Sequence, residues 1–291
     1  MVTPADRRTA VTTAMTTAEI SERRACRFTG FARSTQRYRS ARPPDTELRA
    51  RLHALADRRR RWGYRQFWRV LRREDRRAGR PVVNRKRVQR LYQEEALQVR
   101  RRRRKRRAVV PRTPMPRPTR ANERWSMDFV RDTLGDGRVF RAFTLVDDYT
   151  RESPVIEVDY SLTGERIVQA LDRLARTRGL PQTIVCDNGP EFRGAALDEW
   201  AYAHGVHLDF IDPGKPVQNA FIESFNGTFR EECLNENWFL SLADAQRIIE
   251  AWRVDYNNER PHSQLRDLTP HEFALSLTHA TCSLTPPTGP T

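Results

Sequence analysis

Residues 124–146 read RWSMDFVRDTLGDGRVFRAFTLV and predict two neighbouring β-strands. Segment 124–130 places apolar residues at every second position, as in a strand with one buried face. Segment 139–146 is apolar on both faces except at Arg141 and Thr144, which is typical of a fully buried strand. The Gly-Asp-Gly sequence between the two segments favours a tight hairpin turn. We therefore expect an antiparallel pair of strands that belongs to a sheet.

Further along the chain, short apolar runs alternate with stretches of helical periodicity. Expected strands cover 155–160, 182–186 and 206–211, and expected helices cover 163–178, 194–204, 220–234 and 242–257. Short links make the first three strands antiparallel, and a crossover helix makes the fourth strand parallel to its neighbour. The sequence thus predicts an α/β fold in which helices flank a mixed five-stranded sheet.

The charge of the chain is divided unequally between its two halves. The 291 residues carry 53 Lys and Arg against 37 Asp and Glu, for a formal net charge of +16. Residues 1–120 sum to +27, so residues 121–291 sum to −11. A division this steep indicates a basic, nucleic-acid-binding part joined to an acidic body.

Several protein classes are not expected from this composition. No apolar run approaches the ~20 residues needed to span a bilayer, and the N-terminus lacks the apolar core of a signal peptide. The four cysteines are far apart, which argues against a disulfide scaffold or a structural zinc site. We expect no membrane partner and a cytoplasmic location, associated with the bacterial nucleoid.

The basic half divides into two predicted domains. In residues 1–44, two helical patterns separated by Thr29-Gly30 suggest a helix-turn-helix, with a simple helical hairpin as an equal alternative. Residues 45–107 predict a small all-α, helix-turn-helix-like domain, in which Asn84 caps the last helix. That helix has a basic face made of Arg85, Lys86, Arg87 and Arg90. These cations could be only a solvated helix surface, but the net charge favours contact with double-stranded DNA.

A run of cations and a proline-rich linker separate the basic part from the acidic part. Residues 100–107 are all Arg or Lys, and we expect them to bind DNA phosphates as an extended arm because adjacent cations repel one another. The contacts expected from this arm are Arg101, Arg102, Arg103, Arg104 and Lys105. Residues 108–120 contain four prolines and predict a linker. The catalytic core is then expected over 121–275 and a flexible tail over 276–291.

Three carboxylates are candidate metal ligands. Asp128 is expected to end the first strand and Asp187 the fourth, and Glu223 lies in the next-to-last predicted helix. Oxygen ligands without His or Cys suit Mg²⁺ or Mn²⁺, and two such ions could serve an in-line phosphoryl transfer. Taken one at a time, each residue has a structural alternative: Asp128 as a strand-end cap, Asp187 as a turn aspartate and Glu223 as a surface glutamate.

The motifs around these carboxylates resemble those of a known family. The segments are Trp125-Ser126-Met127-Asp128, VCDNGPEF at 185–192 and PGKPVQNAFIESFNG at 213–227, with further matches at 230–235, 256–262 and 268–270. Thirty-five residues separate Asp187 from Glu223, which is the D-D-35-E spacing of the family. In this order and spacing, the chain resembles bacterial insertion-sequence transposases with a retroviral-integrase-like core, closest to the second-frame product of the insertion-sequence-three type. The resemblance covers roughly residues 55–275.

The resemblance implies a ribonuclease-H-like fold, Mg²⁺-dependent cleavage at the ends of a mobile DNA element, and attack of the freed 3′-OH on another phosphodiester. Asp128, Asp187 and Glu223 would hold the metal ions, and Arg230 would hold a DNA phosphate. Asn188 is expected in a tight turn that lets DNA approach. Lys215 and Asn219 are candidate DNA contacts, with loop solubility and helix capping as equal alternatives.

The resemblance also implies partners and leaves rival functions open. We expect a homo-oligomer on DNA and, as a further partner, the helix-turn-helix and leucine-zipper product of an upstream frame. One rival is a ribonuclease-H-type nuclease, and the other is a non-catalytic DNA-binding regulator or inactive remnant. Rival site residues are Asp147, Asp148, Glu191, His204 and His207, for which turn, capping and surface roles are the default.

Overall fold

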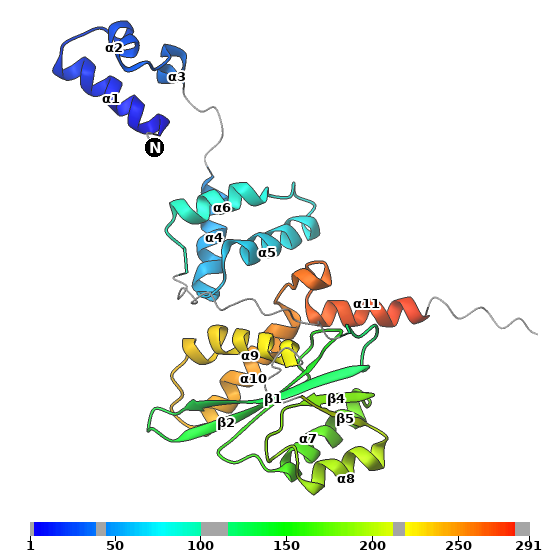
Figure 1. Ribbon diagram of the computed structural model, residues 1–291. Helices are drawn as coiled ribbons and strands as arrows, with labels where there is room; N and C mark the ends of the chain where they lie inside the picture. Colours follow the sequence, from blue (N-terminus) through cyan, green and yellow to red (C-terminus); the bar gives the residue numbers. More distant parts are fainter. Residues whose placement is uncertain (1–2, 39–44, 100–115, 212–218, 283–291) are drawn as a thin grey trace, which may run out of the picture. The chain divides into compact units, whose positions relative to one another are not determined.

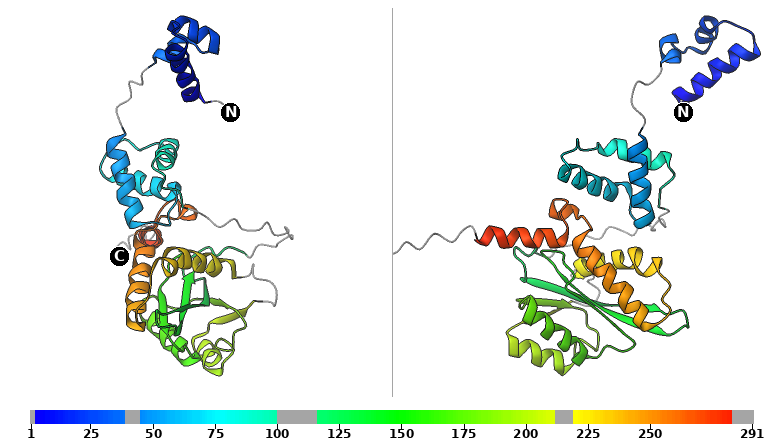
Figure 2. Two further views of the ribbon diagram at one scale, coloured as in Figure 1. Left: turned by 90° about the vertical axis from the view of Figure 1, so that its left-hand side faces the viewer. Right: turned by 180° about the vertical axis from the view of Figure 1, so that it is seen from behind.

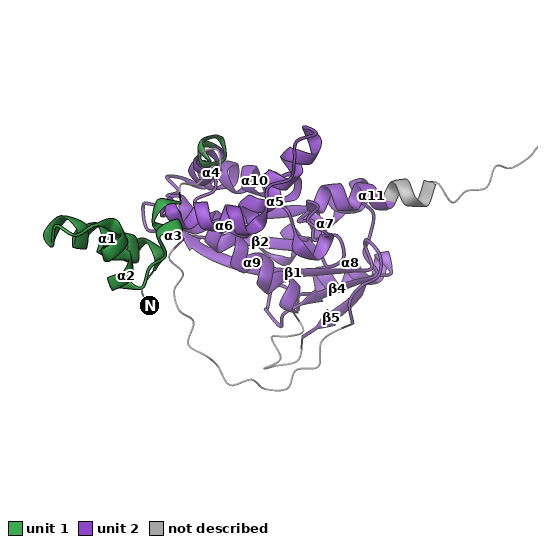
Figure 3. Ribbon diagram, turned by 90° about the horizontal axis from the view of Figure 1, so that it is seen from above, with its two compact units in different colours: residues 1–50 green, residues 51–291 purple. Residues whose placement is uncertain are grey.

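The computed structural model describes residues 3–38, 45–99, 116–211 and 219–282. The described chain divides into two compact units, residues 1–50 and residues 51–291, which Figure 3 shows in different colours. The division falls within helix α4, Thr46–Arg58. Each unit is described by itself below.

The first unit contains three short helices, α1 (Pro4–Thr17), α2 (Glu22–Thr29) and α3 (Arg33–Arg37). Its small core is built from Val11, Ala25, Cys26 and Phe31. Gly30 ends α2 in the left-handed conformation, with φ of 64°, which glycine adopts without steric cost. The predicted break at Thr29-Gly30 and the second helix from Arg33 are therefore present, whereas the sequence pattern did not indicate α1.

The second unit begins with the rest of α4, followed by α5 (Tyr64–Arg77) and α6 (Arg85–Glu94). Apolar side chains at helical spacing are buried here, among them Leu52, Phe67, Leu71, Val88 and Leu91. The predicted N-cap of α6 is confirmed, because Asn84 Oδ1 accepts a hydrogen bond of 2.8 Å from the Lys86 backbone N–H. The basic half thus contains a folded helical region in the second unit, made of the rest of α4, α5 and α6, and not only a charged arm.

A five-stranded sheet forms the centre of the second unit. Its strands are β1 (Arg124–Thr133), β2 (Val139–Asp147), β3 (Val155–Asp159), β4 (Thr183–Cys186) and β5 (His207–Phe210). They lie in the order β3-β2-β1-β4-β5, with β1, β2 and β3 antiparallel and β4 and β5 parallel to β1. This arrangement confirms the predicted mixed sheet.

Helices cover both faces of this sheet. Helices α7 (Gly164–Thr177) and α8 (Ala195–His204) pack on one face around Trp125 and Met127. Helices α9 (Ala220–Glu232) and α10 (Leu242–Asn258) pack on the other face around Val130 and Phe140. Figure 1 shows the two pairs on opposite sides of the strands, and Figure 2 shows the same layers from two further directions.

The C-terminal part adds short 3₁₀ turns at Leu234–Glu236 and Ser263–Leu265 and a last helix, α11 (Pro270–Cys282). The sequence pattern did not indicate α11, and its end lies within the segment expected to be a flexible tail. A capping box explains its start: the Thr269 backbone N–H donates to Glu272 Oε2 at 3.0 Å, and the Glu272 backbone N–H donates to Thr269 Oγ1 at 3.2 Å. Among the described residues, no helix has the length and apolar character to cross a membrane.

Candidate metal and DNA-binding site

Strand register brings Asp128 and Asp187 together. β1 and β4 run parallel, and Ser126 is the register partner of Val185. Asp187 follows directly after β4, so the parallel pairing directs the chain that carries it toward Asp128, and its charge acts on the Asp128 carboxylate. Asp128 lies within β1, which continues to Thr133, so it does not end the strand as the sequence suggested. Along β1, Asp128 lies beyond the last residue that pairs with β4, so β4 does not cover that side of the strand at Asp128.

Two residues from other elements orient the Asp128 carboxylate. Asn226 of α9 donates from Nδ2 to Asp128 Oδ2 at 2.8 Å. The Thr144 hydroxyl of β2 lies 2.9 Å from Asn226 Oδ1 and 3.1 Å from the Asp128 backbone oxygen. Asn226 and Thr144 are both buried. Sequence reasoning assigned no role to Asn226, although it lies one helical turn after Glu223.

Asp187 sits in a tight turn that depends on glycine. Its Oδ1 accepts a hydrogen bond of 2.8 Å from the Gly189 backbone N–H. A Cβ atom at Gly189 would lie only 2.9 Å from the same oxygen, so any side chain there would push the carboxylate away. Asn188 donates from Nδ2 to the Ile211 backbone oxygen at 2.7 Å and accepts from Arg193 at 2.6 Å. In this structure the Asn188 amide therefore holds the turn in place.

Glu223 lies in the first turn of α9 and is exposed. Two residues earlier, the Phe221 ring lies between two guanidinium groups, 4.0 Å from Arg151 and 5.3 Å from Arg124 measured to the ring centroid. These cation–π contacts fix the beginning of α9 against the sheet. Asn219, which precedes the helix, is buried, makes no side-chain cap and has no partner for Oδ1 among the described residues. Lys215 lies outside the described residues.

The three candidate carboxylates influence one another electrostatically. Burial is the main cause that raises the pKa of Asp128 to about 6, and the negative charges of Asp187 and Glu223 raise it further. Hydrogen bonds from the Phe129 backbone and Asn226 oppose this shift. A cluster of like charges of this kind is favourable only when protons or cations neutralise it.

The carboxylates do not, however, converge on one point. Within the described parts of the chain, no three carboxylate, imidazole or thiol groups are close enough to hold a single metal ion. Asp128 and Asp187 form the closely paired part of the site through strand register, whereas Glu223 projects from the exposed first turn of α9. The donor chemistry is that of a site for hard divalent cations, since all three groups supply oxygen.

The predicted basic DNA contacts are exposed where the structure describes them, whereas Asn188 is partly buried and Asn219 is buried. Arg230 lies seven residues after Glu223 on α9, and its Nη1 is 3.5 Å from the Arg131 backbone oxygen. On α6, the basic face is exposed at all four expected positions, Arg85, Lys86, Arg87 and Arg90. Arg90 also pairs with Glu94 at 2.9 Å. Residues 101–105 of the expected arm lie outside the described residues.

The rival acidic residues have structural partners. Asp148 is buried, accepts from Arg124 Nε at 2.6 Å and accepts from Ser126 Oγ at 2.8 Å. Asp147 is also buried, and its Oδ1 accepts from the backbone N–H groups of the turn that follows β2. Glu191 pairs with Arg141, which lowers the pKa of the Glu191 carboxyl. These contacts support the structural roles that were the default for Asp147, Asp148 and Glu191.

The two histidines and a neighbouring cysteine are not suited to ligate a metal. His204 Nδ1 lies 2.8 Å from the Trp200 backbone oxygen, and the two rings stack at 4.7 Å. His207 is exposed at the start of β5. Burial raises the pKa of the Cys186 thiol to about 12, so it stays protonated beside Asp187. Among the described residues, the candidate metal ligands are therefore carboxylates.

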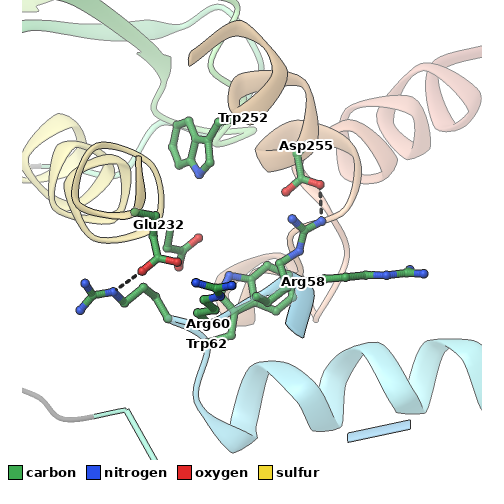
Figure 4. A pocket seen from close by; sticks show the side chains of 9 residues that line it. Arg58, Arg60, Trp62, Glu232, Trp252 and Asp255 are labelled. Carbon is green, nitrogen blue, oxygen red and sulfur yellow. Dashed lines mark hydrogen bonds and ion pairs between the residues drawn. The ribbon is translucent and has the colours of Figure 1, made fainter. Parts of the chain in front are cut away.

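A feature that sequence reasoning missed is the pairing of arginines near α5 with acids of the core. Arg59 pairs with Asp255, and Arg61 pairs with Glu236 at 2.6 Å. Figure 4 shows the pocket at this junction, where Asp255, Glu232 and Trp252 face the segment that contains Arg58, Arg60 and Trp62.

The same type of pairing continues along α5. Asp267 accepts from Arg69 at 2.7 Å and from Arg72 at 3.1 Å. Glu272 pairs with Arg73 at 2.5 Å and with Arg77 at 2.8 Å. These arginines hold the helical region against the core, and the basic face of α6 is separate from them. No local sequence signal indicates these pairs, because about 200 residues separate the partners.

Three comparisons with known proteins bear on this site. Residues 118–216 and 204–270 match two descriptions of an integrase core domain, and residues 44–105 match a helix-turn-helix-like domain. A 31.7 kDa protein of insertion element IS407 from Burkholderia multivorans is 51% identical over 258 residues, covering 88% of this chain and 91% of the relative. The transposase InsD of an Escherichia coli IS2 element is 27% identical over 251 residues, covering 81% and 80%. The simian T-cell lymphotropic virus intasome in complex with a PP2A regulatory subunit is similar in fold, with a TM-score of 0.50 and 15% identity, over 63% of this chain and 62% of that one.

Proposed function

The chain belongs to the bacterial insertion-sequence transposases with an integrase core domain, and on this premise we propose that it cuts and joins the ends of a mobile DNA element. The reaction is a phosphoryl transfer in which a freed 3′-OH attacks a phosphodiester of the target. Asp128, Asp187 and Glu223 form the active site. The observation that carries the proposal is that the parallel β1–β4 pair brings Asp187 toward Asp128, whose pKa is raised to about 6 by burial and by the charges of Asp187 and Glu223.

The oxygen donors suit two Mg²⁺ or Mn²⁺ ions per active site, and Asp128, Asp187 and Glu223 are the residues that would hold them. When bound, such ions supply Lewis acidity to the attacking and leaving oxygens of an in-line displacement. The three carboxylates carry the excess negative charge that divalent cations would neutralise, which would also remove the cost of keeping the partly buried Asp128 ionised.

Other residues of this chain position the DNA and the acids. Asn226 keeps the Asp128 carboxylate oriented through its amide hydrogen bond. Gly189 leaves room for the Asp187 carboxylate in its turn. Arg230, seven residues along α9 from Glu223, is placed to bind a phosphate near the reacting end. The basic face of α6 and the arm 101–105 bind duplex phosphates, with Lys215 and Asn219 as further contacts near the active site.

Assembly follows from the reaction. Joining two element ends requires both ends to be held together, so the active form is a homo-oligomer on DNA. The helical unit formed by α1 to α3 provides a second DNA-binding module in addition to the basic face of α6. A product of an upstream reading frame is a further partner, and the site of action is the bacterial nucleoid in the cytoplasm.

The decisive experiment replaces one candidate ligand. Asp187→Asn removes a negative charge but keeps the size of the side chain, so Mg²⁺-dependent end cleavage and strand transfer should fall to background while DNA retention persists. Asp198→Asn, in an exposed acid of α8, is the matched control and should keep wild-type rates. Unchanged cleavage by Asp187→Asn would refute the active site. DNA retention by a wild-type protein that cuts no DNA at any Mg²⁺ or Mn²⁺ concentration would instead indicate a non-catalytic regulator.

A further inference from the structure

A groove of about 750 Å³ lies between the helical region and α9 in the second unit. The helical side contributes Trp62, Tyr64 and Arg65, and the core side contributes Thr228 and Glu231 of α9. A volume of this size is within the range of about 300–1,000 Å³ that holds a bound small molecule, so it can accept one or two nucleotides. The groove is separate from the carboxylate site but shares helix α9 with it.

The charge of the groove is predominantly positive. Four arginines line it, against Glu231 and Glu232. Three of the arginines already have carboxylate partners: Arg61 with Glu236, Arg69 with Asp267 and Arg260 with Glu232. Arg65 is exposed and contacts no carboxylate in the part of the chain that the structure describes. Its guanidinium is therefore the cation of the groove that is best placed to receive an anionic ligand.

Aromatic rings give the groove a firm wall beside that cation. The Arg65 guanidinium carbon lies 6.0 Å from the centroid of the partly buried Tyr64 ring. Behind Tyr64, the buried Tyr92 ring is 6.3 Å away, and the Tyr92 hydroxyl donates to the Trp62 backbone oxygen at 3.2 Å. Phe67 supports Tyr92 with an edge contact at 5.6 Å. Tyr64 is thus held by packing while part of its surface remains accessible.

The Arg65 Nε donates a hydrogen bond to the Tyr64 hydroxyl at 3.4 Å, and no described carboxylate neutralises its charge. A ring that can stack on a base, next to a guanidinium that can bind a phosphate, is the combination with which proteins bind single-stranded nucleic acid. A base inside a duplex offers only its edges, so stacking on Tyr64 requires an unpaired nucleotide. The position of the groove agrees with this. Thr228 lies five residues after Glu223 on α9, which corresponds to about 7.5 Å along the helix axis.

We propose that this groove binds an unpaired stretch of the DNA strand next to the reacting end, with Tyr64 stacking on a base and Arg65 binding the adjacent phosphate. This inference rests on the proposed function, because it names a substrate contact of the same enzyme. It leads to an expectation that does not follow from the carboxylate site: DNA with a frayed or unpaired end should bind more tightly than fully paired DNA.

The test measures binding of the full-length protein to a fluorescently labelled blunt duplex and to the same duplex with a four-nucleotide unpaired thymidine tail. We expect the tail to tighten binding about fivefold in the wild-type protein. Arg65→Gln and Tyr64→Leu should each reduce this gain to less than about twofold while leaving the affinity for the blunt duplex unchanged. Thr228→Arg, which adds a cation to the groove wall, should increase the gain.

Arg76→Gln is the matched control, since Arg76 is an exposed arginine of the same helix that does not line the groove. It should keep the full gain. No gain in the wild-type protein, or a full gain in both groove variants, would overturn the inference. If the wild-type protein cleaves and joins DNA but binds tailed and blunt duplexes equally well, this inference alone is wrong. If it binds the tailed duplex more tightly but cleaves no DNA, the proposed function alone is wrong.

Discussion

Asn226 Nδ2 donates a hydrogen bond of 2.8 Å to Asp128 Oδ2 and thereby joins helix α9 to strand β1 across 98 residues of sequence. Thr144 of the neighbouring strand completes the arrangement, because its hydroxyl lies 2.9 Å from Asn226 Oδ1. Since Glu223 lies one helical turn before Asn226, the same bond sets the distance of that glutamate from the sheet. An amide with no catalytic chemistry of its own therefore ties the helix that carries Glu223 to the strand that carries Asp128.

Replacement of Asn226 tests this positioning role. Asn226→Ala should lower the rate of end cleavage by about 10- to 100-fold and raise the Mg²⁺ concentration needed for half-maximal rate. The reason is that Asp128 loses the hydrogen bond that orients it and lowers its pKa. Cleavage is followed on labelled element ends over a series of Mg²⁺ concentrations. Ser224→Ala, an exposed change on the same helix, should leave both values unchanged, and equal behaviour of the two variants would contradict the role.

The contact between the helical region and the core can be tested at Asp267, which accepts hydrogen bonds from Arg69 and Arg72. Its φ of 66° is tolerated by asparagine, so Asp267→Asn changes the charge and keeps the backbone. We expect the free energy of unfolding to fall by about 1–2 kcal/mol, because two partly buried arginines lose their anion.

Urea denaturation measures this loss. Glu250→Gln is the control, since Glu250 is a half-exposed partner of Arg253, and the change should cost less than about 0.5 kcal/mol. A loss at Asp267 no larger than at Glu250 would mean that these arginines do not hold the two parts together.

The arginine arm should control how DNA binding depends on salt. Alanine at Arg101, Arg102, Arg103 and Arg104 should weaken binding and reduce the slope of log affinity against log salt by about 3.6, because each of the four lost phosphate contacts contributes about 0.9. The control removes the same number of charges from exposed core arginines that pair with acids: Arg138, Arg166, Arg173 and Arg247. Fluorescence anisotropy over a salt series measures both slopes. Equal slopes in the two quadruple variants would exclude a dedicated arm.

The buried Asp148 carboxyl should leave a signature in the pH dependence of stability. Burial outweighs the hydrogen bonds from Arg124 and Ser126 and raises the pKa of Asp148 from 3.8 to about 6. The folded state therefore binds one more proton than the unfolded state between about pH 4 and pH 6. This favourable contribution is fully present below about pH 4 and is lost as the pH rises through 6, by up to about 3 kcal/mol.

Comparison of the wild-type protein with Asp148→Asn isolates that contribution, because the variant cannot titrate at this position. The difference in free energy of unfolding, wild type minus variant, should grow as the pH is lowered from 7 to 4. Urea denaturation at several pH values provides the numbers. A difference that stays constant, or that shrinks on acidification, would show that Asp148 remains ionised in the folded protein.

Local patterns in the sequence were sufficient for the strands, the central helices and the mixed directions of the strands. The alternation in 124–130, the buried run 139–146 and the lengths of the links predict an antiparallel first part and a parallel strand after the crossover helix, whereas the pairing of β4 with β1 came from the structure. The capping residue Asn84 likewise predicted the start of α6. Helix α11 was missed because its signal, Thr269 followed by Glu272, lies next to a segment whose composition resembles a loop.

The amino-acid sequence by itself determined the α/β fold, the basic and acidic halves and the identity of the three candidate acids, because periodicity, charge and motif spacing can all be read along the chain. Tertiary structure alone decided that Asp128 lies beside Asp187 through the β1–β4 register, that Asn226 orients Asp128, and that the arginines of α5 pair with acids about 200 residues away. The physical reason is that a side chain's partners depend on how the elements pack, and packing joins residues whose separation along the chain carries no information about their contact.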